Sequence, residues 1–286
     1  MVIIDAHSHP DWHGHDLAKT LENMDRYNIR KSWLLSWEVP DDEWDHGAWA
    51  FQWRAGEGPI PFSRCLSYKE RAPERFVLGY MPDPRRPGAV DRLVAAKRIY
   101  GVQVCGELKL RMTYDSPDAI RLFRVCGEEG LPVTVHIDYE FGTGHSYPRP
   151  NWWYGGGIGA FERALKLCPG TAFLGHAPGF WAHISDDGQH DKAPYPKGRV
   201  VPGGEVERLL RQCPNLYCDI SAGSGHNALS RDIEYTKGFL AEFQDRVLYA
   251  RDYFDNVHQE LLDSLGLPVG ILEKIYHKNA EKLAGA

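Results

Sequence analysis

Eight short apolar runs recur along the 286-residue chain, and stretches with helical periodicity lie between most of them. Strands that alternate with helices in this way form a parallel sheet. Eight such units over roughly 250 residues or more predict an α/β fold, a (β/α)8 barrel of the TIM type, rather than an open doubly wound sheet. The expected strands are 2–6, 31–37, 75–81, 102–110, 131–137, 171–174, 216–220 and 246–250, and the expected helices are 16–27, 64–71, 89–99, 117–129, 161–167, 205–212, 236–243 and 271–283.

A single barrel of this kind accounts for residues 1–286 as one domain. Three long segments interrupt the alternation, at about 40–63, 139–159 and 177–203. They follow the second, fifth and sixth strands and therefore lie at the C-terminal face of a barrel, where active sites of this fold are found. Their content of tryptophan, tyrosine and histidine favours ordered loops that cover a site.

Charge and composition exclude several other classes of protein. The chain has 33 basic and 39 acidic residues and a net charge of −6, which argues against nucleic-acid binding through a broad basic surface. The longest stretch without Asp, Glu, Lys or Arg, 167–185, contains proline and glycine and is not a membrane span. Six cysteines without Cys-x-x-Cys spacing and no visible signal peptide predict a cytoplasmic protein with reduced thiols. We expect a small-molecule substrate. The sequence is compatible with either a monomer or a homo-oligomer.

Polar side chains gather at the expected C-terminal ends of the strands. His7 and His9 follow the first strand two residues apart, so both imidazoles can point to one side and reach a single metal ion. Alone, this pattern is a weak signal and is more often that of a polar loop, here beside a turn at Pro10. The ends of strands five, six and eight add three more such groups, His136, His176 and Asp252. Together these groups predict a metal site at the C-terminal face of the barrel.

Strand four is expected to direct charged side chains into the barrel. If its apolar parity faces the helices (Val104, Leu108, Leu110), the other parity faces inward (Cys105, Glu107, Lys109). A carboxylate or ammonium inside a packed barrel is costly unless it is paired or bound to a metal. This arrangement therefore strengthens the prediction of a metal site.

Six stretches of the chain, taken in order, are similar to one known family. They are IIDAHSHP, LPVTVHID, FLGHAPG, LYCDIS, VLYARDY and IYHKNAEKL, and they extend from Ile3 to about Leu283. This set resembles the amidohydrolase superfamily, and most closely its amidohydrolase-related branch (amidohydrolase 2), which comprises metal-dependent enzymes on a TIM barrel. The resemblance implies that His7, His9 and Asp252 ligate a divalent metal, that His136 is a further ligand, and that His176 is a ligand or a catalytic group. It also implies that Asp252 takes a proton from the metal-bound water, whose pKa zinc lowers to about 7.

Two positions depart from the common pattern of such relatives. Glu107 could bridge two metals, which we favour; Lys109 could instead be carboxylated and bridge them, or the two could form an ion pair. Arg251 stands where relatives carry a small residue, and its parity directs it toward the helices or the loop layer in a structural role. Zinc suits the predicted ligands, manganese is the alternative, and one or two ions could bind.

Candidate substrate-binding residues lie at strand ends and in the long loops. Aromatic rings there could stack on a sugar or an aromatic ring, or only pack the loops. The remaining histidines, His13, His190 and His258 among them, are expected at the surface or in caps. The candidates are Lys109, Trp37, Tyr139, His145, Trp152, Trp153, His183 and His226.

The predicted activity is that of a metal-dependent hydrolase, in which metal-activated hydroxide attacks an ester, lactone, amide or phosphoester bond of a small molecule, with Asp252 and His176 as catalytic residues. The alternative is a metal-dependent non-oxidative decarboxylase of an aromatic or dienoic acid, which a single metal and a Glu107–Lys109 ion pair would favour. A metal-stabilised binding protein without turnover is a third possibility, but the full set of strand-end ligands argues against it.

Overall fold

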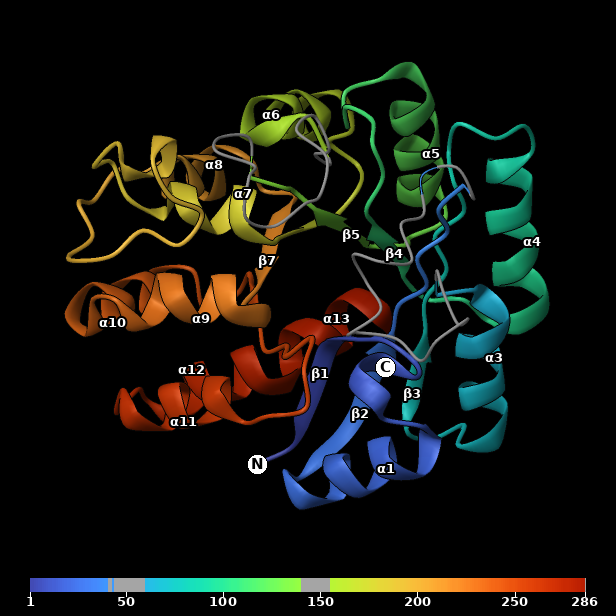
Figure 1. Ribbon diagram of the computed structural model, residues 1–286, viewed down its shortest axis with the longest axis horizontal. Helices are drawn as coiled ribbons and strands as arrows, with labels where there is room; N and C mark the ends of the chain where they lie inside the picture. Colours follow the sequence, from blue (N-terminus) through green and yellow to red (C-terminus); the bar gives the residue numbers. More distant parts are fainter. Residues whose placement is uncertain (41–42, 44–59, 140–154, 286) are drawn as a thin grey trace.

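Eight parallel strands form a closed barrel in the computed structural model, which describes residues 1–40, 43, 60–139 and 155–285 (Figure 1). Neighbouring strands pair in the order β1 to β3 and β4 to β8. A parallel bridge between Gly79 and Val104 joins these two groups on one side, and the amide of Ala6 donates to the carbonyl of Tyr249 at 3.0 Å on the other. The strands are β1 (Ile3–Ser8), β2 (Ile29–Leu34), β3 (Phe76–Leu78), β4 (Cys105–Leu108), β5 (Val133–His136), β6 (Phe173–His176), β7 (Leu216–Asp219) and β8 (Val247–Leu248). The predicted barrel is confirmed.

Helices surround the barrel, and each of the eight predicted ones is present. Side-chain caps begin several of them: Asp16 accepts from the amide of Lys19, and Ser116 accepts from the amide of Ala119 just before Pro117. The helices are α1 (Leu17–Arg26), α3 (Phe62–Arg71), α4 (Ala89–Tyr100), α5 (Pro117–Glu128), α6 (Gly157–Leu167), α7 (Pro178–Trp181), α8 (Glu205–Gln212), α9 (Ala222–Ser230), α10 (Ile233–Glu242), α11 (Val257–Ser264), α12 (Val269–Glu273) and α13 (Asn279–Ala284), with short turns η1 (Trp12–Gly14), η3 (Ala182–Ile184), η4 (Gln189–Asp191) and η5 (Lys274–Lys278). None in the described part of the chain is long and apolar enough to cross a bilayer.

Four parts of the chain differ from the expectations. The segment 177–203, expected to be a loop, contains α7, η3 and η4. Helices α9 and α11 were not predicted, because α9 contains two glycines and two serines and α11 is only eight residues long. The expected last helix, 271–283, is a run of α12, η5 and α13 with a π-turn in its middle.

The hydrophobic core has two layers. The inner layer fills the barrel with residues such as Ile4, Trp33 and Val104, and Ala280 and Ala284 of α13 pack against it from the end where the strands begin. The outer layer lies between strands and helices. The strand ends opposite α13 are therefore left for polar side chains.

Strand β4 corrects part of the parity argument. Val104 lies in the inner layer and Cys105 in the outer one, the reverse of the prediction. The pairing of β4 with β5 shifts register between Cys105 and Leu108, and this irregularity changes which side of the strand faces inward. The outward placement of Leu108 and Leu110 agrees with the prediction.

Candidate metal centre

The strand ends bring together all six side chains for which a ligand role was predicted. Five of them are buried, and the Asp252 side chain is 12% exposed. Asp252 lies four residues after the end of β8, has a φ of 60°, and its amide donates to the carbonyl of His7 at 3.0 Å. The elements that supply the six are β1 (His7, and His9 just after it), β4 (Glu107), β5 (His136), β6 (His176) and the segment after β8 (Asp252).

Four of these donor atoms are spaced as ligands of one ion would be. Oε2 of Glu107 lies 3.8 Å from Nε2 of His7 and 3.4 Å from Nε2 of His9. Oδ1 of Asp252 lies 3.9 Å and 3.6 Å from the same two nitrogens. Ligands about 2.1 Å from a tetrahedral ion lie roughly 3.4 Å apart. Both Nε2 of His7 and Oδ1 of Asp252 are buried without a hydrogen-bond partner, so the residues present fit a divalent metal.

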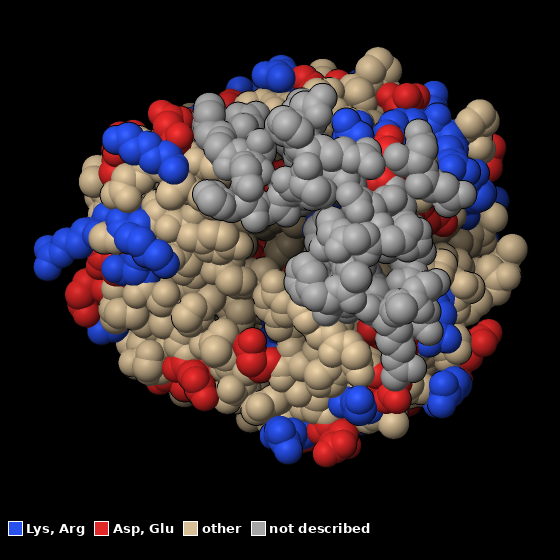
Figure 2. All heavy atoms as spheres, in the orientation of Figure 1, with Lys and Arg blue, Asp and Glu red and all other residues tan. Residues whose placement is uncertain are grey.

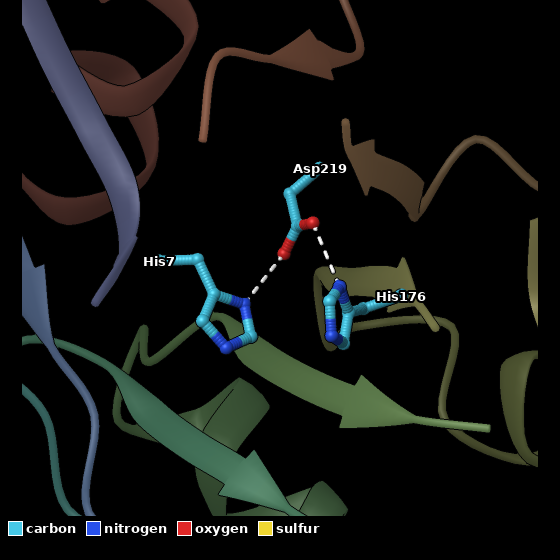
Figure 3. Close-up of side chains that lie close together, drawn as sticks. All are labelled: His7, His176 and Asp219. Carbon is cyan, nitrogen blue, oxygen red and sulfur yellow. Dashed lines mark hydrogen bonds and ion pairs between the residues drawn. The ribbon is translucent and has the colours of Figure 1, made fainter. Parts of the chain in front are cut away.

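Hydrogen bonds at the back of the rings orient the imidazoles. Asp219, at the end of β7, accepts from Nδ1 of His7 at 2.9 Å with one oxygen and from Nδ1 of His176 at 3.0 Å with the other (Figure 3). Nδ1 of His9 donates to the carbonyl of Leu35 at 2.8 Å. A proton held on Nδ1 leaves the lone pair of Nε2 directed at the centre, as in many metal sites.

Asp219 is a functional residue that the sequence reasoning did not single out. It is fully buried, and Ser221 donates from its amide and its hydroxyl to the same carboxylate. The available signal was its place at the C-terminal end of the seventh strand, inside the stretch LYCDIS.

The Glu107 carboxylate stays ionised in spite of its burial. Burial raises the pKa of Glu107, but hydrogen bonding and charge from His136 outweigh it and hold that pKa well below its usual range. For His7, burial lowers the pKa, but the Asp219 carboxylate raises it well above the ordinary value. A proton on His7 thus balances the negative charge of the metal-free site, and a bound cation would replace this proton.

Glu107 stands between two groups of ring nitrogens. Its Oε2 faces His7 and His9, while its Oε1 lies 2.8 Å from Nδ1 of His136 and 3.6 Å from Nε2 of His176. Each oxygen therefore faces a different pair of histidines, and the contact with Nδ1 of His136 is a hydrogen bond. Lys109 instead stacks its ammonium over the ring of Trp37, 4.8 Å from the centroid.

The predicted substrate-binding residues divide into three sets. Trp37, Lys109 and Tyr139 are buried at or after the ends of β2, β4 and β5. His183 and His226 contact other histidines, His190 at 4.4 Å and His258 at 5.6 Å between ring centroids. The remaining three, His145, Trp152 and Trp153, lie outside the described residues.

A loop after β1 brings two further side chains toward the centre. Trp12 packs against His9, with ring centroids 5.2 Å apart, and its indole donates to the carbonyl of Asp252. Next to it, His13 lies edge-on to the ring of Tyr253 at 5.0 Å, and its Nε2 is buried without a hydrogen-bond partner. His13 itself is half-buried, because the left-handed backbone of Asp11 and His13 folds the loop back over the strand end. The expectation that His258 lies at the surface or in a cap is wrong, because this side chain is buried in α11 and its Nε2 contacts the carbonyl of Ala222 at 3.0 Å.

Arg251 takes the structural position that its parity predicted. Its Nε donates to Asp5 at 2.8 Å and one terminal nitrogen donates to Asn23 of α1 at 2.8 Å.

In the orientation of Figure 1, Lys and Arg side chains lie mainly toward the edge of the face, and the surface is hollowed near its centre (Figure 2).

Comparisons with known proteins agree on family and fold. A family model described as Amidohydrolase matches residues 4–285. A TIM-barrel protein from Bordetella bronchiseptica is 15% identical, with a TM-score of 0.67 and all of both chains covered. A probable 2-pyrone-4,6-dicarboxylic acid hydrolase from Acinetobacter baumannii is 12% identical, with a TM-score of 0.61 over all of both chains. A dihydroxybenzoic acid decarboxylase from Polaromonas, with bound manganese, is 14% identical, with a TM-score of 0.59 over 99% of this chain and 96% of that one. No curated protein matches the chain.

Proposed function

Because the chain belongs to the amidohydrolase family, we propose that it is a metal-dependent hydrolase of a small molecule, acting on an ester, lactone, amide or phosphoester bond. The observation that carries this proposal is the position of Glu107, whose two carboxylate oxygens face two different pairs of histidines. A carboxylate so placed suits a centre of two ions, which can hold both the attacking and the leaving oxygen in a hydrolysis.

Two sets of residues would hold the ions. His7, His9, Asp252 and Oε2 of Glu107 would form one, and His136, His176 and Oε1 of Glu107 the other. Nitrogen and carboxylate ligands suit zinc, with manganese as the alternative. When bound, zinc supplies Lewis acidity and lowers the pKa of a coordinated water to about 7.

Asp252 is the carboxylate best placed to accept a proton. Asp219 is fully buried and uses both oxygens on histidines, and Glu107 is 4% exposed, whereas Asp252 is the more open of the three. A general base placed within reach of the reacting proton contributes about 10²–10⁴-fold to the rate. His176 has its Nδ1 held by Asp219, which leaves Nε2 to act as a ligand or to hold a proton near the reacting bond.

A decarboxylase is the second candidate, and one observation favours it. Lys109 is buried with its ammonium over the indole of Trp37 at the end of β4. A cation beside an aromatic plane can bind the carboxylate and the ring of an aromatic acid together.

The test is an assay of the zinc- and manganese-loaded protein on compounds of both classes. 2-Pyrone-4,6-dicarboxylate, a lactone, reports hydrolysis by the loss of its ring absorbance, and 2,6-dihydroxybenzoate reports decarboxylation by release of CO2. We expect turnover in the lactone and ester panel, two ions at the strand-end centre, and a loss of at least about 100-fold in kcat for Asp252→Asn. CO2 release with one ion per chain would move the assignment to the decarboxylase, and full activity of Asp252→Asn would refute its role as the base.

A further inference from the structure

Two histidines outside the strand-end centre face each other in the segment that follows β6. His183 belongs to η3 and His190 to η4, and their ring centroids are 4.4 Å apart with the planes tilted by 36°. The same centroid separation, 4.4 Å, joins His7 and His176 in the candidate metal centre. Rings at this separation are close enough for one nitrogen of each to reach a common ion.

One nitrogen of each ring lacks a hydrogen-bond partner, as a metal-binding nitrogen does before the metal is bound. Nδ1 of His183 and Nδ1 of His190 are both buried, and neither has a hydrogen-bond partner. Nε2 of His190 lies 3.3 Å from the carboxylate of Asp191. A carboxylate on one ring nitrogen keeps the proton there and leaves the lone pair on the other, which is the relation that orients metal-binding histidines.

Hydrogen bonds hold the backbone around the pair in place. Arg231 of the α9–α10 connection donates to Asp187 at 2.8 Å, and the amide of Gln189 donates to the same carboxylate group at 2.9 Å. The amide of Asp186 donates to the carbonyl of Val201 at 2.9 Å. The turn between η3 and η4 is thus fixed before any ligand arrives, and little ordering is needed for the two rings to bind together.

Burial keeps the imidazole of His183 neutral. Burial and, after it, the neighbouring His190 lower the pKa of that ring to about 4, although Glu205 and Asp191 act to raise it. A neutral imidazole is the form that binds a metal.

We propose that His183 and His190 form an accessory binding site for a divalent transition ion, through the Nδ1 atoms of both rings. Imidazole donors suit Zn²⁺, Cu²⁺ and Ni²⁺ rather than Mg²⁺ or Ca²⁺. With two protein ligands the remaining positions of the ion belong to solvent. The ion would link η3 to η4 and so stabilise the segment that follows His176, the residue at the end of β6.

The test counts Zn²⁺ per full-length chain after removal of metal with a chelator and dialysis against Zn²⁺. We expect His183→Ala and His190→Ala each to hold one ion fewer than the unaltered chain. His277→Ala is the matched control and should lose no ion, because His277 also pairs with a carboxylate, Glu281 at 3.1 Å, but contacts no second histidine among the residues that the structure describes. Asp191→Asn should keep the ion with affinity lowered about tenfold.

A second arm separates this site from the strand-end centre. In His7→Ala, which damages that centre, the accessory ion should persist, and Cu²⁺ bound there should show nitrogen couplings from two imidazoles in its electron paramagnetic resonance spectrum. Equal ion counts in the unaltered chain, His183→Ala and His190→Ala would overturn the proposal, as would a copper spectrum unchanged by these substitutions. Failure of the strand-end centre alone, with the accessory ion retained, would count only against the proposed function.

Discussion

Replacing Asp219 by asparagine tests whether the carboxylate behind the rings controls the metal centre. Asp219 accepts from His7 and His176 with one oxygen each, at 2.9 and 3.0 Å, inside a fully buried site. Asparagine has the same shape but a single acceptor oxygen, so its amide NH2 must face one of the two Nδ1–H groups. A hydrogen bond to a charged group contributes about 1.5–3 kcal/mol, and one of the two is lost. This corresponds to roughly a 10- to 100-fold weaker binding of the metal.

Competition with a chelator of known affinity measures this change directly. Asp83→Asn is the matched control, because Asp83 is also buried and paired, with Arg85 at 2.9 Å, but contacts none of the strand-end histidines. We expect Asp83→Asn to lower stability to unfolding by urea while the dissociation constant of the metal stays the same. A metal affinity of Asp219→Asn within about twofold of the unaltered chain would refute the reasoning that this carboxylate orients the ligands.

Three further predictions follow from buried titratable or charged side chains. Glu107→Gln should reduce the number of ions at the strand-end centre from two to one, because a neutral amide cannot bridge two cations; a total count by elemental analysis equal to that of the unaltered chain would contradict the bridging role. Arg251→Met should lower the free energy of unfolding by about 3–5 kcal/mol, since it leaves the buried Asp5 carboxylate unpaired, and Arg251→Met combined with Asp5→Leu should recover much of this loss in urea unfolding. Burial lowers the pKa of His258 from 6.5 to about 4, so the folded chain should lose stability as the pH falls from about 6.5 toward 4, by up to roughly 3 kcal/mol, and His258→Gln should show a correspondingly smaller loss between pH 7 and pH 4.5.

The barrel was predictable because its determinants are local. Each strand is a short apolar run and most helices carry a clear periodicity, so the positions of all eight strands agree with the structure to within a few residues. The exceptions have local causes too. Helix α9 is poor in helix-forming residues, and its first residue, Ala222, is left-handed with a φ of 58°. Its position depends on packing that the sequence pattern does not contain.

The candidate centre was predictable only as far as its residues end strands in a recognisable pattern. His7, His9 and Glu107 could be proposed as ligands because a parallel barrel brings its strand ends together. Asp219 and His13 were not predicted as residues of the site, for a different reason. Asp219 acts on the far nitrogens of His7 and His176, and that contact joins residues 212 and 43 positions apart. His13 reaches the site through two left-handed residues, and a polar stretch with no periodicity does not reveal such a turn.

Left-handed backbone at non-glycine residues gathers where the last three strands meet the centre. Ala177 directly follows His176, Ala222 follows Ser221, and Asp252 itself carries the third such φ, at 60°. A residue with a side chain is disfavoured there by about 1 kcal/mol or more, so each turn must be held by its surroundings. The amide of Asp252 donates to His7, and that of Ala222 donates to the carbonyl of Arg251 at 2.9 Å. These bonds run between neighbouring strand ends, so the closure between β8 and β1 stabilises the turn that aims Asp252 inward, and a substitution that loosens this closure would misplace Asp252.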